Sequence, residues 1–179
     1  MRTAWEMSSV RLDSSGGSLS QRESGRHMYT TKIGHAHLKV RDLDRSIVFY
    51  TRFLALRETE RVANHYAFLT SGDLHHEIAL QQVGPDAPAP PQGGTGLYHV
   101  AFEAPTRRAF AEAYAALTQA GISVAPVDHR ISWAMYFDDP DGNGLEIYWD
   151  TRAEPDGATL WHGVNRPLPS ADILAALEA

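Results

Sequence analysis

The chain of 179 residues contains no cysteine. Disulfide bonds, thiolate zinc sites and cysteine nucleophiles are therefore excluded, and any bound metal would have to be held by nitrogen and oxygen atoms. The 9 histidines provide ample nitrogen for such a site.

Long apolar runs and excess positive charge are also missing. No run approaches the ~20 apolar residues that cross a bilayer. Residues 1–27 lack the apolar core, roughly 7–15 residues long, of a secretion signal. We therefore expect a cytoplasmic protein that spans no membrane. The 16 basic residues are outnumbered by 22 acidic ones, which gives a formal charge of −6. This charge disfavours nucleic-acid binding, because phosphate recognition needs a basic patch.

The chain contains an internal sequence repeat. The segment IGHAHLKV at 33–40 is echoed by LYHVAFEA at 97–104, with His35 and His99 at equivalent places. A helical stretch and further strand-like runs follow each copy. The sequence therefore predicts an α+β fold made of two tandem βαβββ modules, at 33–83 and 97–150.

The predicted elements are the same in both modules. Asp42 is an expected helix N-cap, and Gly121 is expected to end the second helix. The expected strands and helices are 33–40, 44–54, 57–62, 66–69 and 74–83, then 97–103, 106–120, 122–126, 133–137 and 145–150.

The regions outside the modules have different compositions. Residues 1–27 are rich in Ser, Gly and Arg and are expected to be disordered, with Met28 a candidate start. The main domain is expected over 28–151, and the Pro- and Gly-rich segment 84–94 links its modules. Residues 152–179 are expected to form a tail with a short helix near 171–177, which Ser170 could cap.

The repeat also suggests a metal site. His35 and His99 would face each other across a pseudo-twofold axis, and Glu146 lies on the last strand of the second module. Two histidines and one carboxylate on one side of an ion leave the other side open for substrate and oxygen. His37 lies on the same face as His35, but no acidic residue follows it closely, so we interpret it as structural or as a residue that supports a metal ligand.

The stretch 33–150 resembles the vicinal oxygen chelate superfamily, in which paired βαβββ modules form an open, barrel-like mixed sheet around a divalent metal. Within that superfamily it is most similar to type I extradiol ring-cleaving dioxygenases of the catechol 2,3-dioxygenase kind. The similarity lies in the segments HHEIAL at 75–80, LYHVAF at 97–102 and YFDDPDGNGLEIY at 136–148.

This resemblance implies a function and a set of roles. His35, His99 and Glu146 would hold Fe(II), with Mn(II), Zn(II) and Ni(II) as alternatives. His76 matches the acid–base histidine of these enzymes, Tyr136 a tyrosine that hydrogen-bonds substrate, and His129 a histidine near the oxygen site. The spacing between His129 and Tyr136 is two residues shorter than in the family, and Arg130 stands where the family has glycine. The implied partners are an aromatic substrate and O2, and we expect a homodimer.

Other readings remain open. If Glu77 rather than His76 faces the pocket, the set His35, Glu77, His99 and Glu146 resembles that of glyoxalase I, a lyase, or an epimerase. A non-catalytic module that binds small molecules is a third possibility, although such members lack the ligand set. The acidic run 139–144 is better explained as a hairpin turn than as a calcium loop.

Overall fold

The computed structural model describes residues 31–91 and 93–178. Residues 34–179 form one compact unit, distinct from Met1–Ile33. The expectations of disorder over residues 1–27 and of a start at Met28 lie outside the described residues.

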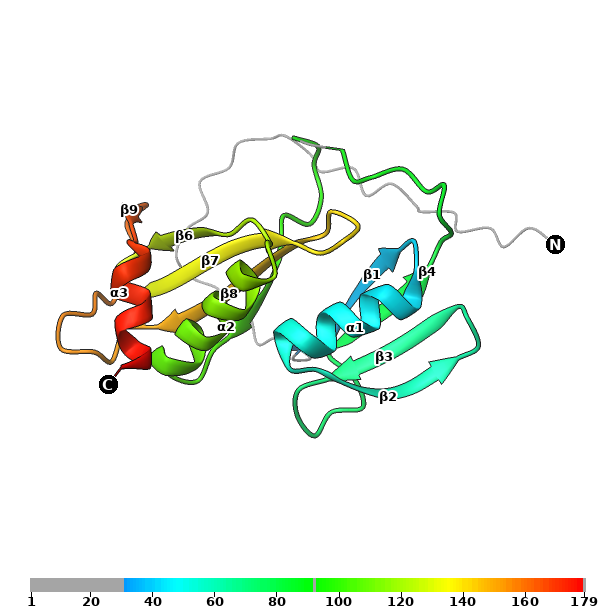
Figure 1. Ribbon diagram of the computed structural model, residues 1–179, viewed down its shortest axis with the longest axis horizontal. Coiled ribbons are helices and arrows are strands. Elements are labelled where there is room, and N and C mark those ends of the chain that lie inside the picture. The colour runs from blue at the N-terminus through cyan, green and yellow to red at the C-terminus, as the bar shows by residue number, and fades with distance from the viewer. Residues whose placement is uncertain (1–30, 92, 179) are drawn as a thin grey trace, which may run out of the picture. The chain divides into compact units, whose positions relative to one another are not determined.

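The first module has the predicted βαβββ order and a four-stranded sheet (Figure 1). The sheet has the strand order β1-β4-β3-β2, with β1 parallel to β4 and the other neighbours antiparallel. Its elements are β1 (Ala36–Val40), α1 (Leu43–Leu54), β2 (Arg57–Val62), β3 (Tyr66–Thr70) and β4 (Ile78–Gln82).

The second module repeats this topology and adds one strand from the C-terminal segment. Its sheet has the order β5-β8-β7-β6-β9, again with a parallel pair between the first two strands. Its elements are β5 (Val100–Glu103), α2 (Arg107–Gln119), β6 (Ala125–Asp128), β7 (Ser132–Asp138), β8 (Gly144–Asp150) and β9 (Arg166–Pro167). The α+β class and the duplicated module are thus confirmed. The two sheets stay open, and no ladder joins them among the described residues.

The helices begin where local capping chemistry allows. The side chain of Asp42 accepts a hydrogen bond from the amide of Arg45, and Thr106 does the same for Ala109. Each cap satisfies an amide that would otherwise lack a partner at the start of the helix. Gly121 follows α2 with φ of 75°, a left-handed conformation that glycine adopts without strain.

Several strands begin later than the sequence pattern predicts. The first strand of each module starts just after its histidine, at Ala36 and Val100, and β4 starts at Ile78 rather than at residue 74. His35, His76 and His99 therefore lie on the short segments that lead into strands. Alternation of faces along a strand does not determine their direction, since they stand outside the regular ladder.

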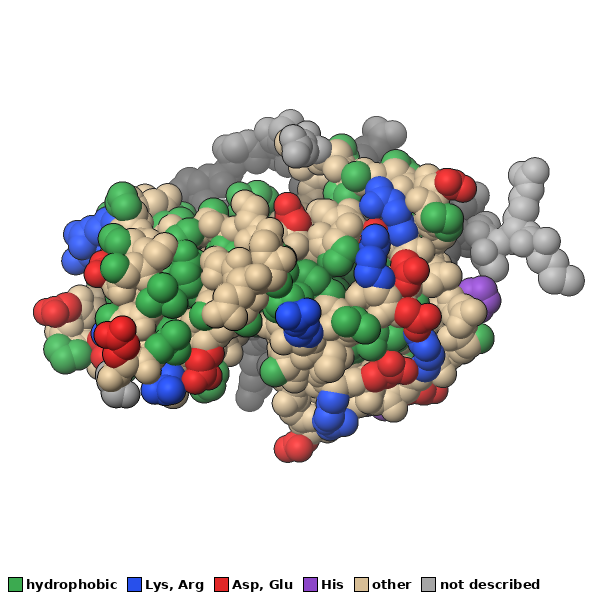
Figure 2. Space-filling model, in the orientation of Figure 1, with side chains coloured by type: hydrophobic (Ala, Val, Ile, Leu, Met, Phe, Trp, Pro, Cys, Tyr) green, Lys and Arg blue, Asp and Glu red, His purple; other side chains and the backbone are tan. Residues whose placement is uncertain are grey.

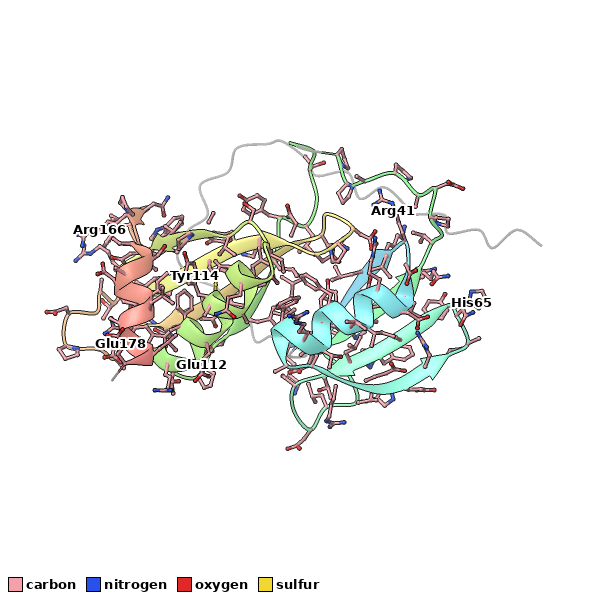
Figure 3. The ribbon with its side chains drawn as sticks, in the orientation of Figure 1. Arg41, His65, Glu112, Tyr114, Arg166 and Glu178 are labelled. Atoms are coloured by element: carbon pink, nitrogen blue, oxygen red, sulfur yellow. The ribbon has the colours of Figure 1, made fainter. Side chains whose placement is uncertain are left out.

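The C-terminal segment is part of the second module. β9 pairs with β6, and the helix α3 (Ser170–Leu174) continues as a 3₁₀ turn at Ala175–Leu177. The short helix was predicted, but Ser170 does not cap it. Pro169 occupies the cap position, and the hydroxyl of Ser170 lies 2.6 Å from that of Tyr114 on α2, labelled in Figure 3.

A turn of the second module joins it to the first. The hydroxyl of buried Tyr50, on α1, donates to Asp139 at 3.1 Å, and Arg41 and Arg45 contact Asp141 at 3.2 and 2.6 Å. The rings of Phe49 and Phe137 also lie near each other, tilted by 42° with centroids 6.5 Å apart. Both aspartates are buried, so their partners offset the cost of removing charge from water. These contacts set how the modules meet within the compact unit.

The visible surface carries charges of both signs. On the face shown in Figure 2, acidic and basic side chains are interspersed, with hydrophobic side chains between them. In the described part of the chain, no helix has the length and apolar character needed to cross a membrane.

Candidate metal centre

His99 and Glu146 are brought together by the parallel pair of strands in the second module. The register aligns Val100 with Leu145 and Ala101 with Glu146, so His99 precedes β5 beside the start of β8. Nε2 of His99 lies 2.7 Å from Oε2 of Glu146. Glu146 is buried, and Nδ1 of His99 is buried with no hydrogen-bond partner among the residues that the structure describes. A carboxylate this buried is rare without a cation or donor beside it.

This pair fits a divalent metal ion. Imidazole nitrogen with carboxylate oxygen is a donor set that suits iron, manganese and zinc. The two donor atoms, Nε2 of His99 and Oε2 of Glu146, lie 2.7 Å apart, so one ion could contact both. His99 and Glu146 could therefore serve as neighbouring ligands after a small movement.

Tyr136 and His129 lie beside this pair. Tyr136, on β7, is aligned with Glu146 on β8, and its ring centroid is 5.3 Å from that of His99. Burial, followed by the negative charge of Glu146, raises the pKa of Tyr136 to about 12, so the phenol stays protonated at neutral pH. Nε2 of His129 lies 2.8 Å from the Tyr136 hydroxyl. A cavity of about 280 Å³ adjoins His99 and Tyr136.

The first module holds the other predicted residues. The rings of His35 and His76 have centroids 4.5 Å apart, and Phe68 packs on His76 at 4.9 Å. Nδ1 of His75 lies 2.9 Å from Nδ1 of His76, and Nε2 of His75 lies 3.1 Å from Glu60. Burial, followed by the neighbouring histidines, lowers the pKa of His76. His76 is therefore favoured in its neutral form, which can accept a proton.

Glu77, the alternative ligand, points elsewhere. Its carboxylate accepts hydrogen bonds from the amide and hydroxyl of Ser71 at 2.8 and 2.6 Å, and from Thr70 at 3.3 Å. The Ser71 hydrogen bonds lower the pKa of Glu77. The Glu77 carboxylate therefore stabilises the turn between β3 and β4. The neighbouring His76 is the residue that contacts His35. His37 meets Tyr66 edge-on at 6.0 Å.

The carboxylates of the turn at 139–143 are bonded to donors from the protein. Asp139 accepts from the amides of Asp141 and Asn143 at 2.8 and 2.9 Å, and from the side-chain amide of Asn143 at 2.8 Å. Its oxygens are occupied by donors from the protein, as expected for a structural turn and not for a calcium loop.

The predicted ligands fall into two groups. His99 and Glu146 are in contact, and His35 lies with His76 on the other module. Within the described ranges 31–91 and 93–178, no three His, Asp or Glu side chains lie close enough to hold one metal ion. The three-ligand centre is therefore not assembled within these residues.

Comparison with known proteins places the fold in a family. The model of the Glyoxalase/Bleomycin resistance protein/Dioxygenase superfamily matches residues 32–147. The chain belongs to this superfamily. The matched range covers the first module, the second module as far as the middle of β8, and every candidate residue from His35 to Glu146.

Relatives within the superfamily have more than one activity. Catechol-2,3-dioxygenase of Bacillus subtilis is 38% identical over 123 residues, covering 67% of this chain and 42% of that protein. Biphenyl-2,3-diol 1,2-dioxygenase 3 of Rhodococcus globerulus is 36% identical over 126 residues, 63% of each chain. Glutathione transferase FosA of Serratia marcescens is 32% identical over 120 residues, 65% of this chain and 79% of that protein. The chain thus spans less than two thirds of the two dioxygenases.

Two residues near the candidate site could not be found from the sequence. Asn165 and Trp161 reach His129 from the C-terminal segment, with Asn165 Oδ1 2.7 Å from His129 Nδ1 and the Trp161 ring 5.7 Å from the His129 ring. The strand that brings this segment back to β6 is β9, which has 2 residues. A strand that short has no readable periodicity.

Proposed function

We propose that the chain is an Fe(II)-dependent extradiol dioxygenase that cleaves a catechol-type aromatic ring with O2. The observation that carries the proposal is the contact between His99 and Glu146, with Tyr136 beside both. Two relatives that are 36–38% identical are named as dioxygenases of ring diols, which supports the same reaction class.

The residues of the chain would divide the work. His99, Glu146 and His35 would hold the ion. Bound Fe(II) would supply positions for two adjacent catechol oxygens and for O2, and a route for electron density between ring and oxygen. Tyr136 would form a hydrogen bond with a substrate oxygen. His76 would accept a proton from a substrate hydroxyl and later donate it back to the reacting substrate.

The contact between His76 and His35 supports this proposal over the lyase or epimerase reading. The lyase reading needs Glu77 as a fourth ligand, but the Glu77 carboxylate accepts three hydrogen bonds from the 70–71 turn. Glutathione transfer is the second candidate function, because the match to this chain spans 79% of the length of FosA. His75 and His76 argue for ring cleavage, since fosfomycin-type transferases do not typically carry that pair.

We further propose that two copies of the chain complete each metal centre. His35 of one copy would join His99 and Glu146 of the other, because no such set of three meets within the described residues of one chain. Both β1 and β5 are edge strands. An edge strand presents unpaired peptide groups that a second chain can meet. Beside β5, Leu97 and Tyr98 are 70% and 85% exposed, which leaves apolar surface for a partner to cover.

The reaction is tested on the full chain. Metal-free protein is loaded with Fe(II) under anaerobic conditions, the bound iron is measured, and O2 uptake and ring-fission products are followed with a panel of catechols. We expect a yellow product and one O2 consumed per substrate. Protein that binds iron one-to-one but shows neither signal would contradict ring cleavage. Consumption of glutathione by the same protein would favour the transferase.

The shared centre is tested by mixing two inactive variants. His35→Ala and Glu146→Gln each remove one ligand from every centre. In mixed dimers, one centre would receive His35 from one chain and Glu146 from the other. Random mixing should then restore about a quarter of the centres, as statistics predict for a twofold dimer. Co(II) binding gives the readout without turnover. A centre contained in one chain would gain nothing from mixing.

A further inference from the structure

The C-terminal segment places a side chain directly against a residue of the candidate site. β9 runs antiparallel to β6, with Asp128 opposite Arg166, which is labelled in Figure 3. One step further along the same register, His129 comes opposite Asn165. The pairing of the strands therefore delivers Asn165 to the ring of His129.

His129 is held at both ring nitrogens. Nδ1 lies 2.7 Å from Oδ1 of Asn165, and Nε2 lies 2.8 Å from the hydroxyl of Tyr136. In a neutral imidazole one nitrogen donates and the other accepts. The hydrogen-bond partner of Nδ1 thus determines whether Nε2 donates a hydrogen bond to Tyr136 or accepts one from it.

Trp161 fixes which atom of Asn165 faces the imidazole. Nε1 of Trp161 lies 2.7 Å from the carbonyl of Val164 and 3.3 Å from Oδ1 of Asn165. The indole N–H is a donor only, so it favours an oxygen rather than the amide NH₂ at this position. The same ring meets His129 edge-on, at an interplanar angle of 84°. With Oδ1 facing His129, Nδ1 must carry the hydrogen.

The tautomer of His129 determines the direction of its hydrogen bond with Tyr136. The Tyr136 hydroxyl lies within hydrogen-bond distance of Nε2 of His129 at 2.8 Å, and Tyr136 is aligned with Glu146 on the neighbouring strand. When Nδ1 of His129 carries the hydrogen, Nε2 has a free lone pair. Nε2 then accepts a hydrogen bond from the Tyr136 hydroxyl. The phenol oxygen then has its lone pairs free to accept a hydrogen bond in the site.

We propose that Asn165, oriented by Trp161, is a positioning residue that holds His129 in the Nδ1–H tautomer, so that the Tyr136 hydroxyl donates its hydrogen bond to Nε2 of His129. The value of this arrangement for catalysis rests on the proposed function. The arrangement itself depends only on the contacts among these side chains. Partners that orient the side chains around a metal site typically change metal affinity or activity about 10–100-fold when removed.

The test reads the tautomer directly. Full-length protein labelled with ¹⁵N is kept metal-free at about pH 8, where an unperturbed histidine is neutral. Two-bond ¹H–¹⁵N spectra distinguish protonated from bare ring nitrogens, and His129→Gln assigns the signal. We expect His129 to show a protonated Nδ1. In Asn165→Leu this pattern should be lost, and in Asn165→Asp it should remain because a carboxylate still accepts from Nδ1.

Trp161→Phe completes the series, since it keeps an aromatic ring but removes the indole N–H donor. We expect part of the Nδ1–H population to be lost. A wild-type His129 protonated at Nε2, or a spectrum unchanged in Asn165→Leu, would overturn the inference. In the Fe(II)-loaded protein, Asn165→Leu should lower kcat about 10-fold or more while Asn165→Asp retains more. If the wild type cleaves no catechol but the tautomer result holds, the proposed function fails and this inference stands.

Discussion

Glu146 Oε2 lies 2.7 Å from Nε2 of His99, although 47 positions of sequence numbering separate the two residues. The contact follows from the parallel pairing of β5 with β8, which is the second-module equivalent of β1 with β4. A parallel pair needs a long crossover connection, so ligands at its ends are necessarily distant in sequence. The geometry of the candidate centre therefore depends on how closely these two strands approach each other.

Gly144 controls that approach, and Gly144→Ala should disturb it. A Cβ at this position would overlap the carbonyl oxygen of Tyr98 and lie 3.5 Å from the Cα of His99. We expect a loss of about 2–3 kcal/mol in the free energy of unfolding, as for other overpacked sites. We also expect weaker Co(II) binding, because His99 is displaced.

The matched control is Gly72→Ala, where a Cβ meets no atom within 4 Å. Urea denaturation of both variants gives the difference in stability. Equal stability of the two variants would show that the close approach at Gly144 can relax freely.

The sequence patterns were sufficient to predict the duplicated module and its capping, for local reasons. Apolar spacing and turn residues report on neighbours in the chain, and the Asp42 cap and the glycine after α2 are local in this sense. The onset of β1 and β5 was predicted too early. Hydrophobic side chains such as Ile33 and Leu97 extend the pattern, yet both are exposed in the structure.

The way the modules meet could not be read from the sequence. A repeat with a histidine in each copy is compatible with a centre inside one chain or between two, because the same ligands serve both. The choice depends on long-range contacts such as Tyr50 with Asp139. The approach of Asn165 to His129 escaped prediction for a similar reason, since it depends on a two-residue strand returning to β6.

Glu77→Gln should reveal a pH-dependent part of the stability. The hydrogen bonds from Ser71 lower the pKa of Glu77 in the folded state. A depressed carboxylate pKa stabilises the fold above the unfolded pKa of about 4.3, and that stabilisation is lost as the pH falls through the folded value. At pH 7 we expect the variant to be less stable by about 1–2 kcal/mol, since hydrogen bonds to a charged group are lost.

The measurement is urea denaturation of wild type and Glu77→Gln between pH 7 and about pH 3, with both proteins compared at each pH. The difference in free energy of unfolding between wild type and Glu77→Gln should become smaller only in the acid range, below about pH 4. A gap that stays constant down to the lowest pH would show that the charge of Glu77 does not contribute. Ser71→Ala should reproduce part of the loss at pH 7, because it removes one of the donors.

Tyr50→Phe should weaken the junction between the modules. The Tyr50 hydroxyl is buried and donates to the buried carboxylate of Asp139. Its removal leaves a buried acceptor with one donor fewer, for an expected loss of about 1–2 kcal/mol. Tyr148→Phe is the matched control, because that hydroxyl donates to Glu103 at an exposed site. The control should change stability by no more than about 0.5 kcal/mol. Equal effects in thermal unfolding would argue against a special role for the Tyr50 contact.

Arg130→Gly should stabilise the protein. Arg130 has φ of 68° in the short connection between β6 and β7, a region that costs non-glycine residues roughly 1–2 kcal/mol. Its backbone amide donates to Asp128 and its carbonyl accepts from Thr151, and both hydrogen bonds survive the substitution. Glycine also makes the unfolded chain more flexible, which offsets part of the stabilisation. We therefore expect a net increase of about 1 kcal/mol in the free energy of unfolding. Arg130→Ala keeps the Cβ and separates the backbone effect from loss of the guanidinium. If Arg130→Ala stabilised the protein as much as Arg130→Gly, the gain would come from removing the charged side chain and not from relief of the backbone.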